Sequence, residues 1–166
     1  MQFNGKAHKF GDDVNTDYII SGKYKFKTLD MKELAKHVME DLDPNFYKKV
    51  TPGDFIVGGS NFGCGSSREQ APLAIKYADV GAVLAKSFAR IFYRNAINTG
   101  LPVVECDTDQ IDEGDEITVD LTAGIITNKT KNTTIPIKPL PGVMIKILND
   151  GGLAEHFKKY GGFNFS

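Results

Sequence analysis

The chain has 166 residues, of which 41% are hydrophobic and 25% are charged, and its formal net charge is −1. This length and composition are typical of one globular domain over residues 1–166, with an ordinary hydrophobic core. A net charge so close to zero argues against nucleic acid as the main partner. No run of about 18 apolar residues predicts a membrane helix, and no signal-peptide core follows Met1. We therefore expect a cytoplasmic protein.

Metal-binding residue types are scarce. The two cysteines, Cys64 and Cys106, are too few for a disulfide framework, an iron–sulfur cluster or a structural zinc without help. The three histidines, His8, His37 and His156, show no metal-ligand spacing. Any metal chemistry is therefore expected to come from a partner.

The first predicted element is a strand over residues 2–10, which ends in a turn at residues 11–13. Asp13, Asn15 and Asp17 follow as alternate polar residues in a short loop. They are typical turn and capping residues. Their spacing also suggests calcium, but an EF-hand loop needs a glycine and a distal glutamate that are missing here.

Residues 23–28 alternate lysines with other residues, a pattern that suits a two-faced strand or an extended loop. Such a charge run is usually a solvated face, but near an anion site it is a candidate for binding a substrate carboxylate. Residues 30–42 have apolar residues at helical spacing and predict one helix capped by Asp30. Its apolar stripe is expected to face the core or a partner.

The central stretch predicts a strand over residues 54–59, a glycine-rich loop, and a helix over residues 69–77. Glycines let such a loop bend tightly and approach a ligand closely. The loop places Ser66 or Ser67 near the helix N-terminus, where unpaired N–H groups and the helix dipole favour an anion. Arg68 adds a planar guanidinium suited to a carboxylate or a phosphate.

The same loop also has a purely structural interpretation. Ser66 or Ser67 could be an N-cap, with Glu69 or Gln70 closing a capping box and Arg68 solvated. The loop pattern alone leaves both interpretations open. It does exclude a Walker P-loop and a nucleophile elbow, because neither motif is present.

The rest of the chain predicts, in order, a strand, a helix, a strand, a hairpin, another strand and two helices: residues 81–85, 87–98, 101–106, 116–130, 134–137, 143–148 and 153–160. Residues 54–85 thus form a strand–helix–strand unit of a parallel sheet. Arg90 and Arg94 lie one turn apart on one helical face. The expected fold class is α/β, a layered sheet with flanking helices and an appended β region.

Residues 11–17, 58–69 and 85–95 carry three motifs whose order is more distinctive than any one of them. In that order they resemble the swivel domain of the aconitase superfamily, with Gly-Ser-Ser-Arg-Glu at residues 65–69 as the strongest signal. A separate chain of this length most resembles the small subunits of the 3-isopropylmalate dehydratase and homoaconitase type. The resemblance implies the swivelling β/β/α domain of the aconitase type.

The resemblance also implies a hydro-lyase that dehydrates and rehydrates a small hydroxy-di- or tricarboxylic acid. A [4Fe-4S] cluster would be held by a large catalytic subunit, and this chain would hold no cofactor or metal. The family's serine base falls on Ser66. Because a serine hydroxyl is a poor base in water, loop N–H groups, the helix dipole and Arg68 are expected to stabilise its alkoxide.

Other site residues follow from the same resemblance. Ser67 and Arg68 match residues that hold substrate carboxylates. Asp17 matches the acidic residue that orients a histidine of the partner's catalytic domains. Cys64 lies in the loop but is expected to be a packing residue or an incidental thiol.

The segment expected to set substrate selectivity, residues 22–28, is one residue longer than its family counterpart, so its register is open. In one register Lys27 binds a distal carboxylate, as in homoaconitase. In the other, Tyr24 faces an apolar isopropyl group.

The resemblance therefore favours the small subunit of an isopropylmalate-type enzyme of leucine biosynthesis. Homoaconitase and 2,3-dimethylmalate dehydratase small subunits are the alternatives. A non-catalytic anion-binding regulatory module is the alternative of another class.

Overall fold

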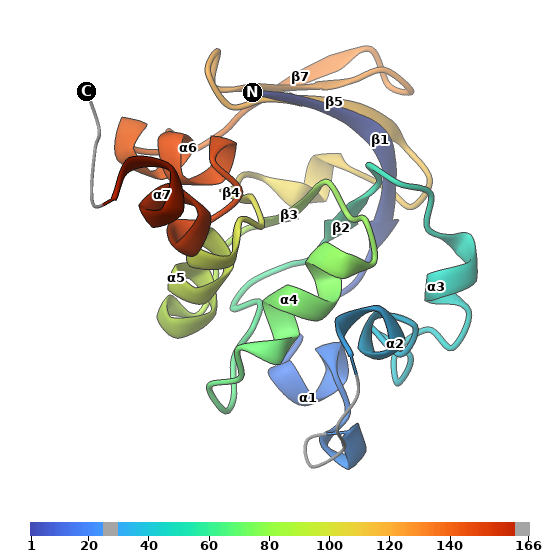
Figure 1. Ribbon diagram of the computed structural model, residues 1–166. Coiled ribbons are helices and arrows are strands. Elements are labelled where there is room, and N and C mark those ends of the chain that lie inside the picture. The colour runs from blue at the N-terminus through green and yellow to red at the C-terminus, as the bar shows by residue number, and fades with distance from the viewer. Residues whose placement is uncertain (25–29, 162–166) are drawn as a thin grey trace.

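The computed structural model describes residues 1–24 and 30–161. Its described strands form a seven-stranded sheet in the order β4-β3-β2-β1-β5-β6-β7 (Figure 1). The strands are β1 (Gln2–Lys9), β2 (Phe55–Val57), β3 (Ala82–Ala85), β4 (Val103–Glu105), β5 (Glu116–Asp120), β6 (Ile125–Asn128) and β7 (Thr133–Pro136).

Strand β1 is shared by two different halves of the sheet. Its second half runs parallel to β2, with Ala7 opposite Phe55, and β3 and β4 continue the parallel half. Its first half runs antiparallel to β5, with Gly5 opposite Ile117. β2 and β3 are buried throughout, as their unbroken apolar runs predict, whereas β5 alternates between buried and more exposed residues. The expected α/β sheet with an appended β region is confirmed.

The sheet curls until its two outer strands approach each other (Figure 1). Just beyond these strands, Cys106 and Ile137 form an antiparallel bridge, and the N–H of Lys138 donates to the carbonyl of Glu105 at 2.9 Å. Fully buried side chains such as Ile117, Ile126 and Ile135 fill the antiparallel half of the core.

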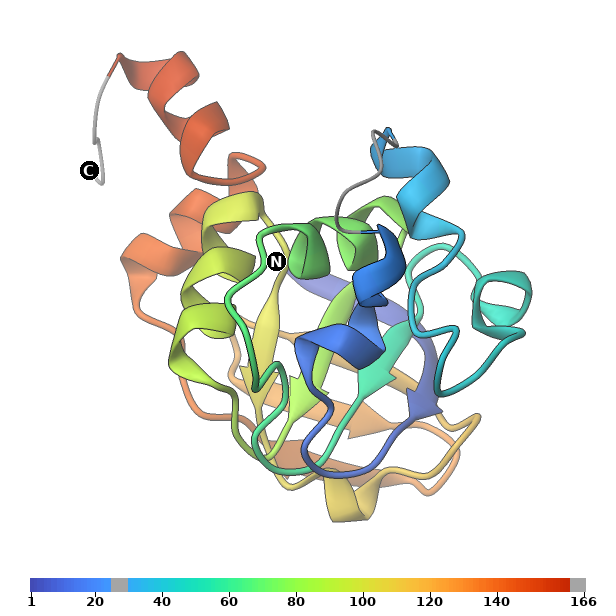
Figure 2. The same cartoon turned by 90° about the horizontal axis from the view of Figure 1, so that it is seen from below.

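The described helices are α1 (Thr16–Ile19), α2 (Met31–Ala35), α3 (Phe46–Lys49), α4 (Gln70–Tyr77), α5 (Arg90–Thr99), α6 (Gly142–Asn149) and α7 (Leu153–Tyr160), with short 3₁₀ turns at Gly22–Tyr24 and Thr108–Gln110. α4 and α5 pack on each other beside the parallel strands, α1 and α2 contact α4, and α6 and α7 contact α5 (Figures 1 and 2). None of the helices in the described part of the chain has the length and apolar character needed to span a bilayer.

The prediction of one helix over residues 30–42 was wrong beyond Ala35. Asp30 caps α2 as expected, because its carboxylate accepts the N–H of Glu33. The chain then leaves the helix, and Met39 adopts a φ of +60° and donates its N–H to the carbonyl of Ile19 at 2.9 Å. Leu34, Ala35, Val38 and Met39 are nevertheless buried, so the predicted packing is confirmed for this part of the stripe, whereas Leu42 is exposed.

The helix predicted over residues 87–98 begins later, at Arg90. Phe88 forms a parallel bridge with Phe62, and the N–H of Ala89 donates to the Phe62 carbonyl at 2.9 Å. These contacts hold the preceding residues in an extended conformation. The predicted extended segment at residues 23–28 overlaps residues 25–29, which lie outside the described residues.

Candidate active site

Three loops gather at the carboxyl edge of the parallel half-sheet, the edge at which α/β sheets bind ligands (Figure 2). They follow β1, β2 and β3 and contain the three motifs singled out in the sequence. The N–H of Gly63 donates to the carbonyl of Val14 at 2.7 Å, which joins the first two loops. The N–H of Lys86 donates to the carbonyl of Gly59 at 3.0 Å, which joins the second and third.

The glycine-rich loop is anchored by an aromatic cluster. The ring of Phe62 lies 6.0 Å from that of Phe88 and 5.4 Å from that of Phe92. Gly63 has a φ of +83°, and a Cβ added there would overlap the Phe92 side chain. Glycine is therefore required at this position, because only glycine combines a positive φ with so close an approach to α5.

Ser66 and Ser67 are both exposed at the end of this loop. The hydroxyl of Thr16, at the start of α1, donates to the backbone carbonyl of Ser66 at 2.8 Å and fixes its position. Neither serine caps α4, whose N-cap is Glu69 and has no side-chain cap bond. The capping-box interpretation is therefore wrong. Within the described residues the Ser66 hydroxyl has no hydrogen-bond partner, so it is available to a ligand.

Arg68 and Asp17 form an ion pair beside the serines. The Arg68 Nη2 lies 2.6 Å from the Asp17 Oδ1, and the Arg68 Nη1 donates to the carbonyl of Ile20 at 3.2 Å. The Arg68 side chain is only 12% exposed, and its Nε has no hydrogen-bond partner in the described part of the chain. The Asp17 side chain is 58% exposed, which leaves it open to a further partner. The structure thus brings Ser66, Arg68 and Asp17 into one neighbourhood.

A cavity of about 300 Å³ lies where these residues meet α5. Its lining residues are Thr16, Gly63, Gly65, Ser66, Ser67, Arg68, Ala89, Arg90, Ile91, Phe92 and Asn95. This size suits a small organic acid. Thr16, Arg90 and Asn95 were not assigned to the site from the sequence. Thr16 lies in the first motif and Arg90 and Asn95 lie in the third, so the motifs themselves were the available signals.

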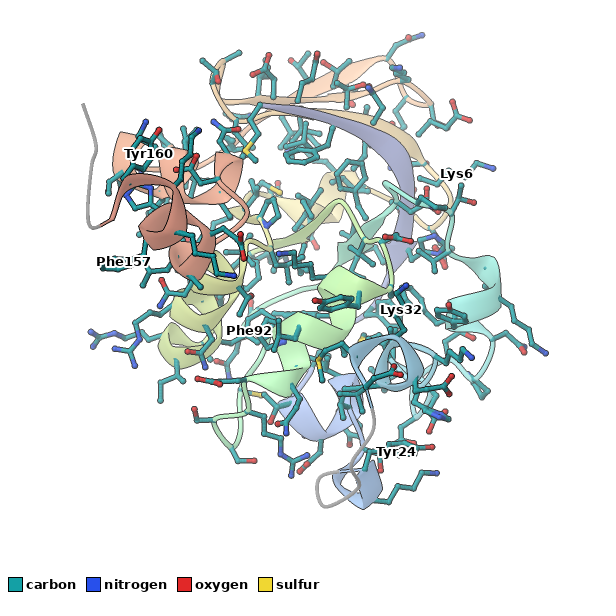
Figure 3. All side chains as sticks on the ribbon, in the orientation of Figure 1. Lys6, Tyr24, Lys32, Phe92, Phe157 and Tyr160 are labelled. Atoms are coloured by element: carbon teal, nitrogen blue, oxygen red, sulfur yellow. The ribbon has the colours of Figure 1, made fainter. Side chains whose placement is uncertain are left out.

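Tyr24 does not line this cavity. Its hydroxyl donates to the Glu40 Oε1 at 2.8 Å and lies 3.0 Å from the His37 Nδ1, and its ring stacks on His37 with centroids 4.3 Å apart. Burial and the Glu40 carboxylate raise the pKa of Tyr24. Figure 3 shows Tyr24 at the end of the molecule far from Tyr160. Lys27 lies outside the described residues.

The cysteines are not suited to hold a cluster. Burial raises the pKa of the Cys64 thiol, and the nearby Asp13 carboxylate adds to this effect. Burial raises the pKa of Cys106 to about 12. In residues 1–24 and 30–161, no three or more His, Cys, Asp or Glu residues are grouped so that they could hold a metal ion.

Asn15 caps α1 by accepting the N–H of Tyr18, in agreement with its interpretation as a capping residue.

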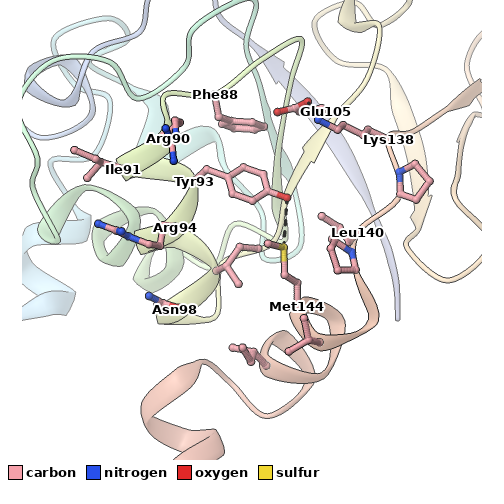
Figure 4. A pocket seen from close by; sticks show the side chains of 15 residues that line it. Phe88, Arg90, Ile91, Tyr93, Arg94, Asn98, Glu105, Lys138, Leu140 and Met144 are labelled. Carbon is pink, nitrogen blue, oxygen red and sulfur yellow. Dashed lines mark hydrogen bonds and ion pairs between the residues drawn. The ribbon is translucent and has the colours of Figure 1, made fainter. Parts of the chain in front are cut away.

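A second and larger cavity of about 960 Å³ lies between α5, α6 and residues 138–141 (Figure 4). Its lining is largely apolar and includes Leu140 and Met144. The Tyr93 hydroxyl lies 3.7 Å from the Met144 sulfur. Among the described residues, the lining of this larger cavity contains no serine, cysteine or histidine. It does contain Tyr93, Glu105 and Lys138, but both serines and the arginine of the Gly-Ser-Ser-Arg-Glu motif line the smaller cavity instead.

The comparison with known families agrees with this geometry. The model of the aconitase C-terminal domain matches residues 8–108, and the chain belongs to this family.

Similar proteins are named as small subunits of one enzyme. The chain is 62% identical over 161 residues to 3-isopropylmalate dehydratase small subunit 2 of Archaeoglobus fulgidus, covering 97% of this chain and 98% of that protein. It is 58% identical over 160 residues to the 3-isopropylmalate dehydratase small subunit of Caldicellulosiruptor saccharolyticus, covering 95% and 92%. A crystal structure of 3-isopropylmalate dehydratase from Methanocaldococcus jannaschii matches with a TM-score of 0.93 and 54% identity, covering 97% of this chain and 96% of that one.

Proposed function

We propose that this chain is the small subunit of a 3-isopropylmalate dehydratase. The complete enzyme would interconvert 2-isopropylmalate and 3-isopropylmalate in leucine biosynthesis, in the cytoplasm. The observation that carries the proposal is an accessible Ser66 hydroxyl beside the Arg68–Asp17 pair in a small cavity. The names of close full-length relatives favour isopropylmalate over homoaconitate and 2,3-dimethylmalate. We further propose that residues 1–166 act as one swivel-like domain.

In this proposal Ser66 is the general base. As an alkoxide, its oxygen takes a proton from the carbon beside a substrate carboxylate and becomes a hydroxyl, which returns that proton in the reverse direction. The hydrogen bond from Thr16 to the Ser66 carbonyl supports this role, because it fixes the backbone that carries the hydroxyl. Arg68 stabilises negative charge nearby, and Ser67 and Arg68 hold substrate carboxylates.

Asp17 has a different proposed role. One of its oxygens holds Arg68, while its exposed side can accept a hydrogen bond from a histidine of the partner subunit. A histidine held in this way would be oriented to deliver a proton to the leaving hydroxyl. The binding of substrate by Tyr24 and Lys27 stays a prediction.

The large subunit would complete the site by supplying a [4Fe-4S] cluster. The cysteines of this chain do not fit such a cluster, since the half-buried Cys106 has a pKa of about 12 and neither cysteine belongs to a group of three or more possible ligands among the described residues. When bound in the partner, the cluster supplies a Lewis acid for the substrate hydroxyl. This chain contributes proton transfer and the binding of carboxylates.

The proposal is tested by reconstitution. The purified chain is assayed alone and after mixing with a cluster-loaded large subunit, using 2-isopropylmalate, homoaconitate and 2,3-dimethylmalate. We expect no turnover by the isolated chain and the highest kcat/KM of the complex for 2-isopropylmalate. Turnover by the isolated chain without iron would overturn the proposal. So would binding of dicarboxylates or phosphate to the isolated chain together with indifference to the large subunit, which is the behaviour of a regulatory module.

A further inference from the structure

The smaller cavity, which Ser66 and Ser67 line, also has a second arginine in its lining, Arg90. It is the first residue of α5 and lines the cavity together with Ser66, Ser67 and Arg68. Arg90 is exposed, and no ion pair involves it within residues 1–24 and 30–161. Arg90 also lines the larger cavity, and Figure 4 shows it near Phe88 and Ile91, at the end of that cavity away from Leu140 and Met144.

Arg68 and Asp17 alone do not give the cavity the positive charge that a dicarboxylate needs. Arg68 is paired with Asp17 at 2.6 Å, so these two side chains together carry no net charge. A substrate with two ionised carboxylates brings two negative charges. Arg90 supplies a positive charge at the cavity that no carboxylate of the described residues offsets.

The position of Arg90 is set by backbone contacts. The N–H of Ala89, the N-cap of α5, donates to the carbonyl of Phe62 in the glycine-rich loop at 2.9 Å. The start of α5 and the serine loop therefore form one unit. No side chain caps α5, and the free N–H groups of a first helical turn add positive potential on the side where Arg90 lies.

We propose that Arg90 is a second substrate-binding residue of this site and binds the carboxylate that Arg68 does not hold. Its planar guanidinium can donate two parallel N–H bonds to a carboxylate. The two arginines enter the cavity from different elements, Arg68 from the loop before α4 and Arg90 from α5. Their separate origins favour a ligand with two acidic groups over one with a single group. This inference rests on the proposed function.

The test uses the complete two-chain enzyme with Arg90→Ala and Arg90→Lys variants. Arg94→Ala is the matched control, because Arg94 lies one turn later on α5, is also exposed, and lines only the larger cavity. The KM for 2-isopropylmalate is measured, together with the Kd for malonate, a dicarboxylate, and for acetate, a monocarboxylate. Assembly of each complex is measured separately by analytical ultracentrifugation.

A lost hydrogen-bonded charge pair corresponds to a change of roughly 10- to 100-fold. We expect Arg90→Ala to raise both the KM and the malonate Kd by about that factor, with a smaller effect on acetate, while kcat falls less. Arg90→Lys should recover part of the loss because it restores the charge. Arg94→Ala should stay within about twofold of the wild type.

Two results would overturn the inference. One is an unchanged KM and malonate Kd in Arg90→Ala. The other is a loss explained by failed assembly, which would make Arg90 a docking residue. A wild-type complex without turnover would instead reject the proposed function, and the malonate Kd values would still decide whether Arg90 binds a dicarboxylate.

Discussion

Each end of the parallel half-sheet has one notable aspartate, and the two aspartates differ in their burial and in their partners. At the amino end, Asp54 precedes β2, with a side chain 5% exposed. It accepts hydrogen bonds from the N–H of Lys6 at 3.0 Å, the N–H of Thr51 at 2.9 Å and the His8 Nε2 at 2.8 Å. At the carboxyl end, Asp17 is 58% exposed and pairs with Arg68.

This difference separates structural from functional polar groups. Asp54 is surrounded by donors of its own chain, as expected for a buried carboxylate that stabilises the fold. Asp17 and the neighbouring Ser66 keep accessible oxygens, which suits a site completed by a substrate and a partner subunit. Changes at the carboxyl end should therefore mainly alter kinetics, and changes at the amino end should mainly alter stability.

Ser66→Ala should have the largest effect. We expect kcat of the reconstituted complex to fall by about 10²- to 10⁴-fold, because that is the usual contribution of a general base. KM and assembly should change little. Steady-state kinetics provide the measurement, and Ser60→Ala, in the same loop, is the control. Intact turnover with only a changed KM would make Ser66 a binding residue instead.

Asp54→Asn should lower the free energy of unfolding by about 3 kcal/mol at neutral pH, because it breaks a buried hydrogen-bonded pair. The kcat of the folded complex should be unchanged. Urea denaturation measures the effect, with the exposed Asp41→Asn as the control. A loss of kcat without a loss of stability would contradict the division between the two ends.

The same variant has a defined pH dependence. Burial opposes the charge of Asp54, but the hydrogen bonds from His8, Lys6 and Thr51 outweigh it and hold the pKa of Asp54 below its usual value. A lowered folded-state pKa means that the stabilisation is complete above the unfolded-state pKa of about 3.9 and is lost as the pH falls through the folded-state pKa. The difference between wild type and variant should therefore shrink below about pH 4.

Arg68→Lys should have an intermediate effect. A lysine keeps the charge but cannot contact Asp17, the Ile20 carbonyl and a carboxylate with one planar group. We expect the KM for 2-isopropylmalate to rise about tenfold, which corresponds to about 1.4 kcal/mol. Arg94→Lys should leave the KM unchanged. Equal KM values for the two variants would argue against carboxylate binding by Arg68.

Thr16→Val should have the smallest effect. It removes the hydroxyl that holds the Ser66 carbonyl and should cost about 1 kcal/mol of stability. Because the Ser66 backbone loses this contact, kcat should also fall, by less than about tenfold. Thr16→Ser keeps a hydroxyl and should restore most of both losses. Failure of that rescue would point to packing of the threonine methyl group.

Much of this arrangement was predictable from local patterns. The apolar runs predicted β2 and β3, and the glycine-rich loop predicted Ser66 or Ser67 near the N-terminus of α4. The family resemblance assigned Asp17 and Arg68 to one site, and the structure adds their ion pair. The strands and the loop depend on residues that are close in sequence, and the site assignments were taken from the family resemblance.

Other features depend on contacts between distant segments. The helix α2 stops early because Met39 donates to the carbonyl of Ile19. Tyr24 stacks on His37 and bonds to Glu40, a pairing that no alternation of charges in its own segment predicts. The place of Arg90 at the cavity arises because the extended stretch before α5 pairs with the serine loop.

The backbone pairing just beyond β4 and β7 has a consequence for the chain before it binds a partner. The outermost strands are short, β4 with three residues and β7 with four, and the backbone beyond them is already paired between Cys106 and Ile137. A long unpaired strand would invite other polypeptides to add to it and aggregate. The part of the chain that the structure describes therefore offers no long unpaired strand of this kind, and under the proposed function a free copy can persist before it meets a large subunit without aggregating through a sheet edge.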